Sequence, residues 1–404
     1  MTSTEIPVGR AQNWLAPALL MGAAGGVAMG FGRLSYAFVL DDMVRAYLGS
    51  YSVAGLIGTA NLTGYVISAL LSGLLLRRWS PEGLSVRGLA VSTACLFVFP
   101  LTSTPMVAGL VMLLLGGAGG LVWISSVPIV SKTVPANRRG VAYGIALSGV
   151  GASAVLTGVV VRVCHGLLGD AGWRATWIVE GCGGLLVLIL VIAFLAHGGT
   201  PGPAQQGSRT LIERPPAGIT AALILYLCYG LMHGIFSNYY VVAAQEGGTL
   251  SHGTATTAFS ILGLTNLFGG MVLGRLSDSW GRRPLLLPGL ILLAGCCAAV
   301  TLHSAGLTLA SSAMYGLLMG GVPAIITAAL ADQLAPADLA RGYAAISLAV
   351  GLGQLLSPPI GGWLADRTGA FTVSFLLATA FAVIGAGAAF GASGLSRRAG
   401  RHRR

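Results

Sequence analysis

Long apolar runs separated by short polar intervals restrict this chain more than any other feature of its sequence. A helix rises about 1.5 Å per residue, so crossing a bilayer takes about 20 mainly apolar residues. Twelve runs of that length occur, and they predict an all-α membrane protein with twelve transmembrane helices. The runs lie near residues 14–40, 51–76, 84–103, 105–130, 140–163, 173–196, 217–244, 255–276, 284–303, 306–331, 342–365 and 371–394.

The charge content agrees with that prediction. Only 9% of the residues are charged, whereas a soluble protein carries about 25%. A net charge of +11 would suit nucleic-acid binding, but the arginines lie in short separate intervals instead of one basic stripe, so we expect no nucleic-acid partner. The six cysteines lie in or beside apolar runs without a CxxC spacing, so we expect them to pack as small apolar residues, with no metal site and no cofactor.

Basic residues favour alternate intervals between the runs. Most of the 23 lysines and arginines fall on one side of the membrane if both ends of the chain lie on that side. Because positive residues are retained on the cytoplasmic side, both termini are expected inside. The arginine-rich end, residues 397–404, is then a basic cytoplasmic tail suited to anionic lipid.

The longest polar interval divides the chain in two. Residues 197–216 are rich in glycine and proline, which predicts a cytoplasmic linker between an N-terminal six-helix bundle (1–196) and a C-terminal six-helix bundle (217–396). Sequence marks repeat between these halves. Arg139-Gly140 recurs as Arg341-Gly342, an offset of about 202 residues. Two parallel repeats imply a pseudo-two-fold axis along the membrane normal, with a central cleft.

A family resemblance lies in the polar interval after the eighth run, which reads Gly274-Arg-Leu-Ser-Asp278-Ser-Trp-Gly281-Arg282-Arg283-Pro. It resembles the signature loop of the major facilitator superfamily of transporters. The resemblance implies gating by Gly274, Asp278, Gly281, Arg282 and Arg283, with a charge network that closes the cytoplasmic side. The alternative is that the arginines only fix the loop inside.

Further stretches are similar to the YbfB/YjiJ-like bacterial branch of that superfamily. They are Gly32-Arg33-Leu-Ser-Tyr36 and the segment Gly351-Leu-Gly-Gln354-Leu-Leu-Ser-Pro, which runs on to Gly362-Trp-Leu-Ala-Asp366. The chain departs from superfamily patterns elsewhere. In the signature loop, Ser279 and Trp280 replace a basic and a smaller aromatic residue. The corresponding loop of the first half has Arg77 where the signature has its acidic residue. The fifth run lacks the Gly-Pro motif of drug/proton antiporters.

Arg33 is the sharpest candidate for chemistry, because it alone among the basic residues falls inside a predicted span. A charge there is expensive and usually faces protein or a water-filled cavity. Its planar guanidinium can bind a substrate carboxylate through two parallel hydrogen bonds. The alternative is a structural arginine, snorkelling outward or paired with Asp41 or Asp42.

Two residues are candidates for proton coupling. Glu180 lies in the sixth run, where it either carries a proton or pairs with Arg33, Arg162 or Arg174. His233 lies on a polar and aromatic stripe of the seventh run and either titrates or forms interhelical hydrogen bonds.

Other polar residues fall on helices that line the cleft in the superfamily, so we expect some of them to contact substrate. The full set of expected substrate-binding residues is Arg33, Tyr36, Asn61, Tyr229, His233, Tyr240, Asn266, Tyr315 and Gln354.

Together these features predict a monomeric secondary transporter of the bacterial inner membrane that works by alternating access. The expected substrate is a small organic anion, with protons as the coupling ion. A proton-coupled exporter of a drug or secondary metabolite is the main alternative, and a non-transporting membrane sensor is a further one. No phosphate loop, metal-ligand cluster or nucleophile motif points to an enzyme.

Overall fold

The computed structural model describes residues 15–134, 139–196, 219–333 and 336–401, and within these ranges it contains helices and no strand. The first span combines α1 (Leu15–Gly25), the π-helical η1 (Gly26–Phe31), α2 (Gly32–Met43) and the π-helical η2 (Val44–Leu48). The other spans are α3 (Tyr51–Arg78), α4 (Pro81–Val98), α5 (Pro105–Thr133), α6 (Arg139–Leu168), α7 (Gly172–Ala196), α8 (Thr220–Ala243), α9 (His252–Trp280), α10 (Arg282–Val300), α11 (Ala305–Gln333), α12 (Pro336–Thr368) and α13 (Thr372–Arg401).

Eleven stretches of the described chain are long and apolar enough to cross a membrane. One of them, Ser148–Phe194, is 47 residues long and covers most of α6 and α7, which are separate helices. Each of the twelve predicted runs therefore coincides with a helical span. The prediction of an all-helical membrane protein is confirmed, although α13 continues to Arg401, within the segment expected to be a tail.

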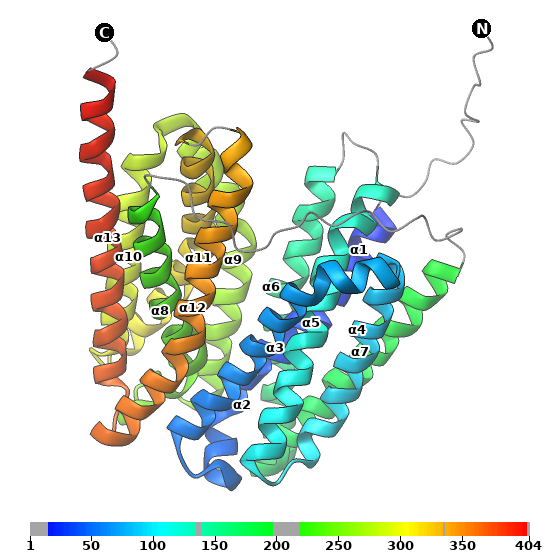
Figure 1. The fold of residues 1–404 in the computed structure, drawn as a ribbon. Coiled ribbons are helices and arrows are strands. Elements are labelled where there is room, and N and C mark those ends of the chain that lie inside the picture. The colour runs from blue at the N-terminus through cyan, green and yellow to red at the C-terminus, as the bar shows by residue number, and fades with distance from the viewer. Residues whose placement is uncertain (1–14, 135–138, 197–218, 334–335, 402–404) are drawn as a thin grey trace, which may run out of the picture.

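The helices form two groups. Helices α1–α7 pack mainly among themselves, as do α8–α13, and the main contacts between the groups join α3 with α12, α6 with α9 and α2 with α8. Figure 1 shows the groups side by side, with the start of α1 and the end of α13 at the same end of the molecule. We call the groups the N-half and the C-half. The predicted linker, 197–216, lies outside the described residues, so the exact domain bounds stay a prediction.

Local sequence explains where several helices begin. Ser50, Ser80 and Ser251 precede α3, α4 and α9, and the hydroxyl of each accepts a hydrogen bond from a backbone N–H at 3.2 Å. Serine at this position satisfies a donor that the first turn leaves free. These serines therefore end the polar turns and start the next span.

The surface of the helices is apolar. Side chains such as Leu70, Met106 and Leu167 are 70–78% exposed, and exposed large aliphatic side chains occur along nearly every span. Contiguous apolar surface of this extent is rare on soluble proteins. It fits a lipid environment, in which a hydrocarbon-facing side chain is favourable.

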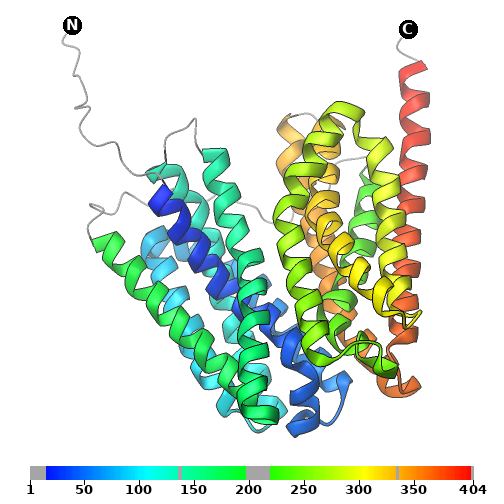
Figure 2. The ribbon, with the colours of Figure 1, turned by 180° about the vertical axis from the view of Figure 1, so that it is seen from behind.

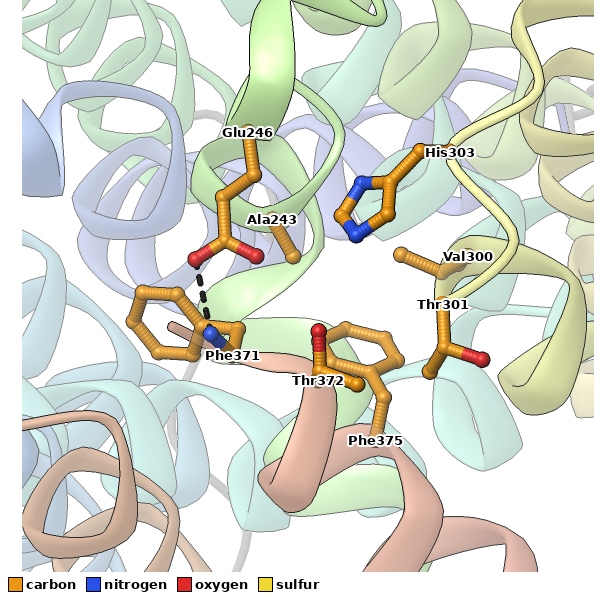
Figure 3. Close-up of a pocket in the computed structure, with 8 residues that line it drawn as sticks. All are labelled: Ala243, Glu246, Val300, Thr301, His303, Phe371, Thr372 and Phe375. Atoms are coloured by element: carbon orange, nitrogen blue, oxygen red, sulfur yellow. Dashed lines mark hydrogen bonds between the residues drawn. The ribbon is translucent and has the colours of Figure 1, made fainter. Parts of the chain in front are cut away.

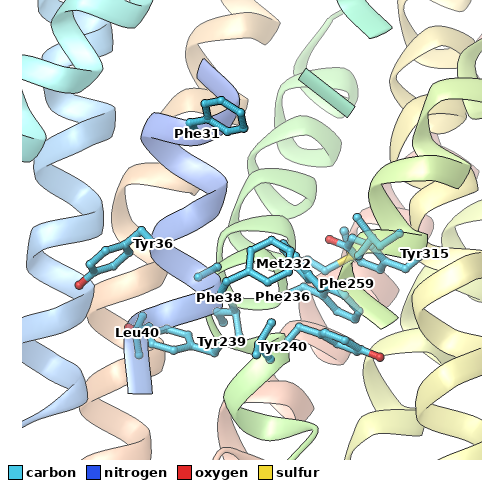
Figure 4. Close-up of a cluster of buried hydrophobic side chains, with 14 of the residues drawn as sticks. Phe31, Tyr36, Phe38, Leu40, Met232, Phe236, Tyr239, Tyr240, Phe259 and Tyr315 are labelled. Atoms are coloured by element: carbon cyan, nitrogen blue, oxygen red, sulfur yellow. The ribbon is translucent and has the colours of Figure 1, made fainter. Parts of the chain in front are cut away.

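Aromatic rings fill the core of the C-half beside the first span (Figure 4). Phe236 of α8 stacks on Tyr315 of α11 with ring centroids 3.6 Å apart. Phe38 of α2 crosses between the halves and meets Phe259 of α9 edge to face, 5.0 Å away. These rings fix α2 against α8 and α9.

Bonds across the two halves lie at the end away from the start of α1, here called the closed end. The Asp366 carboxylate of α12 accepts the backbone N–H groups of Tyr51 and Ser52 at 2.9 and 2.8 Å, and also the Ser52 hydroxyl. Thr59 donates to the Leu355 carbonyl at 2.9 Å. An acid at the first turn of a helix is favourable because the helix dipole is positive there, so Asp366 fastens the N-terminus of α3 to the C-half.

Candidate substrate site between the two halves

Arg33 sits in the first turn of α2, directly after the π-helical segment η1. Such segments widen a helix locally and recur at functional sites. The local packing is tight, because a Cβ on Gly30 would lie 1.6 Å from Ser153 Oγ of α6. From this position Arg33 Nη2 donates to Gln354 Oε1 of α12 at 2.8 Å. The two predicted site residues thus meet across the halves.

A small pocket of about 10 Å³ adjoins Arg33. Asn61 and Tyr65 of α3 contribute its other polar side chains, and the remaining lining comes from Ala28, Met29, Leu62 and Gly116. Asn61 also holds helices together, since its Nδ2 lies 3.3 Å from the carbonyls of both Gly32 and Met112. The pocket therefore offers one cation and a few polar groups within an apolar wall, as small-molecule sites commonly do.

The charge of Arg33 has no carboxylate partner among the described residues. The expected alternative, a pair with Asp41 or Asp42, is wrong. Asp41 accepts from the Tyr51 hydroxyl at 2.6 Å and pairs with Arg45, and Asp42 lies 3.2 Å from His165 Nε2. A guanidinium bonded only to a neutral amide remains available to an anion.

His233 lies on α8 between two tyrosine rings. Its ring is stacked with Tyr229 and Tyr315 at centroid distances of 6.0 and 6.3 Å. Nδ1 is 3.1 Å from both the Tyr315 hydroxyl and the Ser237 hydroxyl. These contacts agree with the interhelical hydrogen-bonding alternative.

Glu180 is buried, with 1% of its surface exposed, and its partners are hydroxyls. Ser35 and Thr157 donate to Oε1 at 2.7 and 2.6 Å, so the carboxyl joins α7 to α2 and α6. Oε2 is buried without a hydrogen-bond partner in the described chain. The expected pairing of Glu180 with an arginine is therefore wrong. Arg162 donates to Thr257, and Arg174 donates to the Pro100 carbonyl.

Three predicted site residues serve helix packing. The Tyr36 hydroxyl donates to the Ala54 carbonyl at 2.7 Å, and the Tyr240 hydroxyl donates to the Thr308 carbonyl at 2.8 Å. Figure 4 shows Tyr36 directed away from the C-half. Asn266 is half-buried against α11, where a Cβ on Gly320 would lie 2.8 Å from its Oδ1. None of the three lines the pocket beside Arg33.

The signature loop is a tight joint between α9 and α10. Gly281 alone separates the helices, with φ 92° and ψ 154°, a conformation open almost only to glycine. Arg282 forms an ion pair with Asp278 and donates to Ser277 Oγ at 2.7 Å. Arg283 is exposed. One pair of the predicted network, Asp278 with Arg282, is thus present within the C-half, and the role of the loop in gating stays a prediction.

A second, shallower pocket lies at the closed end of the C-half (Figure 3). Glu246 and His303 face it together with Phe371 and Phe375. Burial raises the pKa of Glu246, and the Phe371 N–H, 2.7 Å from Oε1, partly opposes that rise. This pocket is small and lies beside the hydrogen bond between Glu246 and Phe371, so it is a weaker candidate for a substrate site than the pocket beside Arg33.

Sequence reasoning missed two groups of residues at the closed end. Asp366 stands in the sequence as part of the stretch that resembles the YbfB/YjiJ-like branch, and nothing there indicates that it caps α3. Asp42, His165 and His252 come together from three helices. They lie 123 and 87 positions apart in the chain, so no local spacing could have marked them.

Comparison with known proteins gives a family. The model described as "Uncharacterised MFS-type transporter YbfB" matches residues 26–390. The chain belongs to this family. The match agrees with the resemblance at Arg33 and Gln354, and the family is one of transporters, not enzymes.

Among curated relatives of this YbfB-family chain, monocarboxylate transporter 12 of Xenopus laevis is 26% identical over 276 residues, covering 59% of the chain and 58% of that protein. The chain thus spans less than three fifths of that relative's length. The aspyridones efflux protein apdF of Emericella nidulans is 24% identical, covering 98% of the chain and 80% of that protein. A bacterial homologue of the human lysosomal transporter Spinster, crystallised in an inward-facing and unoccupied conformation, has a TM-score of 0.73 at 14% identity, covering 95% of the chain and 98% of the other. This likeness confirms the major facilitator fold.

Proposed function

We propose that this protein is a secondary transporter that moves a small organic anion across the bacterial inner membrane by alternating access and couples that movement to protons. The observation that carries the proposal is Arg33, a guanidinium beside a pocket with no carboxylate partner in the described chain. A charge within the membrane without a counterion is costly. A carboxylate substrate would supply the missing anion.

The contact between Arg33 and Gln354 supports alternating access. It joins the halves at 2.8 Å through a neutral amide, which a substrate carboxylate can displace because a charge-assisted, bidentate pair is stronger. With both termini cytoplasmic, the closed end faces outward, and the pocket belongs to an inward-open state. As the halves rock, Arg33 would then exchange Gln354 for the substrate carboxylate.

Glu180 is the better candidate for the proton site. Burial disfavours its ionised form unless a partner compensates, and its partners are the hydroxyls of Ser35 and Thr157. Ser35 lies two residues from Arg33 on α2. A change of charge at Glu180 would therefore alter a hydrogen bond on the helix that carries Arg33. His233, with neutral partners on α8 and α11, is better suited to a structural role.

A ligand-binding assay tests the anion site. Purified protein would be heated with a series of small carboxylates, their neutral amides and comparable amines. A ligand at one hundred times its Kd stabilises a protein by about 2.7 kcal/mol, which raises Tm measurably. We expect stabilisation by a carboxylate in the unchanged protein and in Arg367→Ala, whose exposed arginine stacks on Trp363, but none in Arg33→Ala. Arg33→Lys should be intermediate, because lysine keeps the charge without the fork.

The alternative function is export of a drug or secondary metabolite, which the similarity to the aspyridones efflux protein over 98% of the chain favours. It predicts stabilisation by bulky neutral or cationic compounds that persists in Arg33→Ala. That result would overturn the anion proposal.

A further inference from the structure

Three side chains with metal-binding groups meet at the closed end. Asp42 comes from α2, His165 from α6 and His252 from α9, and one ligand atom from each lies within 4.8 Å of the others. Helices α6 and α9 pack against each other across the two halves (Figure 2). Two of the ligands therefore belong to the N-half and the third to the C-half.

His252 has an environment that its protein neighbours do not satisfy. Both ring nitrogens are buried, and neither has a hydrogen-bond partner in the described part of the chain. The ring lies 4.5 Å from that of His165, tilted by 44°. Buried polar atoms without partners are uncommon and call for an explanation. A cation held between the imidazoles and the carboxylate would satisfy a nitrogen of His252.

The spacing suits a transition-metal ion. Zn²⁺ holds histidine nitrogen and carboxylate oxygen at about 2.0–2.2 Å, so two ligands of a tetrahedral ion lie about 3.4 Å apart. His165 Nε2 and Asp42 Oδ2 are already 3.2 Å apart. The third ligand atom lies within 4.8 Å of the others, so a side-chain adjustment of at most about 1.4 Å completes the set. Two histidines and one carboxylate leave a coordination position open for water.

We propose that Asp42, His165 and His252 form a site for a divalent transition-metal ion that fastens the N-half to the C-half at the closed end. The ion gains its third ligand only when His252 lies against α2 and α6. It therefore binds the closed arrangement more tightly and shifts the population toward it. The site is separate from the pocket beside Arg33, and the proposal does not depend on which solute is transported.

The neighbouring charges permit such a site. Arg45 Nη2 lies 3.5 Å from Asp42 Oδ1 and opposes a cation there, but its side chain is 67% exposed and can turn to solvent. The same guanidinium pairs with Asp41, which adds a second negative charge nearby. The metal would replace the present hydrogen bond between His165 and Asp42.

Zn²⁺ titration of the purified, tag-free protein tests the site. We expect one tightly bound ion per chain, with the Kd at least about tenfold weaker in His252→Gln, because even changes around a metal's ligands weaken binding 10- to 100-fold. His165→Gln should weaken it similarly. His303→Gln is the matched control, since His303 is an exposed histidine at the same end of the molecule. His252→Cys should restore binding, because a thiolate also binds Zn²⁺.

Two outcomes would overturn the proposal. The first is a Kd that His252→Gln leaves unchanged, which would place the ion on other surface groups. The second is loss of binding in His252→Gln without recovery in His252→Cys when both variants elute as the folded protein. Spin labels at Leu101 and Leu302, exposed positions in opposite halves, supply the second readout. Zn²⁺ should sharpen the short-distance population in the unchanged protein but not in His252→Gln.

Discussion

At the scale of single residues, charge placement distinguishes this protein from a generic helical bundle. Arg33 has a neutral partner, Gln354, where an ion pair would be the usual solution within a membrane. Glu180 has two hydroxyl partners where a cation would be expected. The two ionisable side chains do not neutralise each other. Under the proposed function, Arg33 would bind a substrate anion and Glu180 would carry a proton.

Replacing Glu180 by glutamine separates these roles. The amide oxygen still accepts from Ser35 and Thr157, so we expect the variant to fold and to exchange substrate across a liposome membrane at a rate close to that of the unchanged protein. Accumulation driven by a pH gradient should be lost, because the amide cannot carry the proton. Uptake of labelled substrate, with and without the gradient, measures both. Glu246→Gln, a half-buried carboxyl outside the spans, is the control; gradient-driven uptake equal to wild type in Glu180→Gln would make Glu180 structural.

At the scale of elements, helix ends and helix contacts set the state of the molecule. The closed end depends on one element capping another, because Asp366 of α12 occupies the N-terminus of α3. The opposite end has its charge pair, Asp278 with Arg282, within the C-half. In the described part of the chain, Asp366 thus joins the halves at the closed end, whereas the Asp278–Arg282 pair at the other end lies within one half.

Removing the Asp366 cap should open the closed end. Replacing a capping acid by alanine costs about 0.5–2 kcal/mol, which corresponds to a shift of about 2- to 30-fold in the ratio of closed to open forms. We expect the long distance between spin labels at Leu101 and Leu302 to be populated in a larger fraction of Asp366→Ala molecules than of unchanged molecules. Asp170→Ala, another acid beyond the spans, should leave the distribution unchanged. An unaltered distribution in Asp366→Ala would show that packing alone closes this end.

The sequence predicted the elements well, because the length of a hydrophobic run is a local property. It also selected Arg33 and Gln354, although it could not pair residues 321 positions apart. The sequence offers arginines as partners for Glu180 because charge is visible in a sequence. The approach of the Ser35 and Thr157 hydroxyls depends instead on how α2, α6 and α7 cross. The same limit hid the cluster of Asp42, His165 and His252.

At the scale of the whole molecule, two helical halves meet at one end and enclose Arg33 between them. The main interfaces between the halves join α3 with α12 and α6 with α9, and rocking about them would expose the pocket to either side in turn. Family membership supplies the fold and the transporter class. The proposed substrate class rests on Arg33, a guanidinium within a span that has no carboxylate partner in the described chain.

Proton movement in liposomes tests this account most directly. The protein would be reconstituted into vesicles that hold a pH-sensitive dye, and carboxylates, neutral solutes and cations would be added outside in turn, with protein-free vesicles correcting for passive entry of acids. The account predicts internal acidification with a carboxylate, abolished in Arg33→Ala and retained in Arg367→Ala. Proton movement that follows only cations or bulky neutral compounds, with Arg33→Ala fully active, would contradict it and make Arg33 a structural residue.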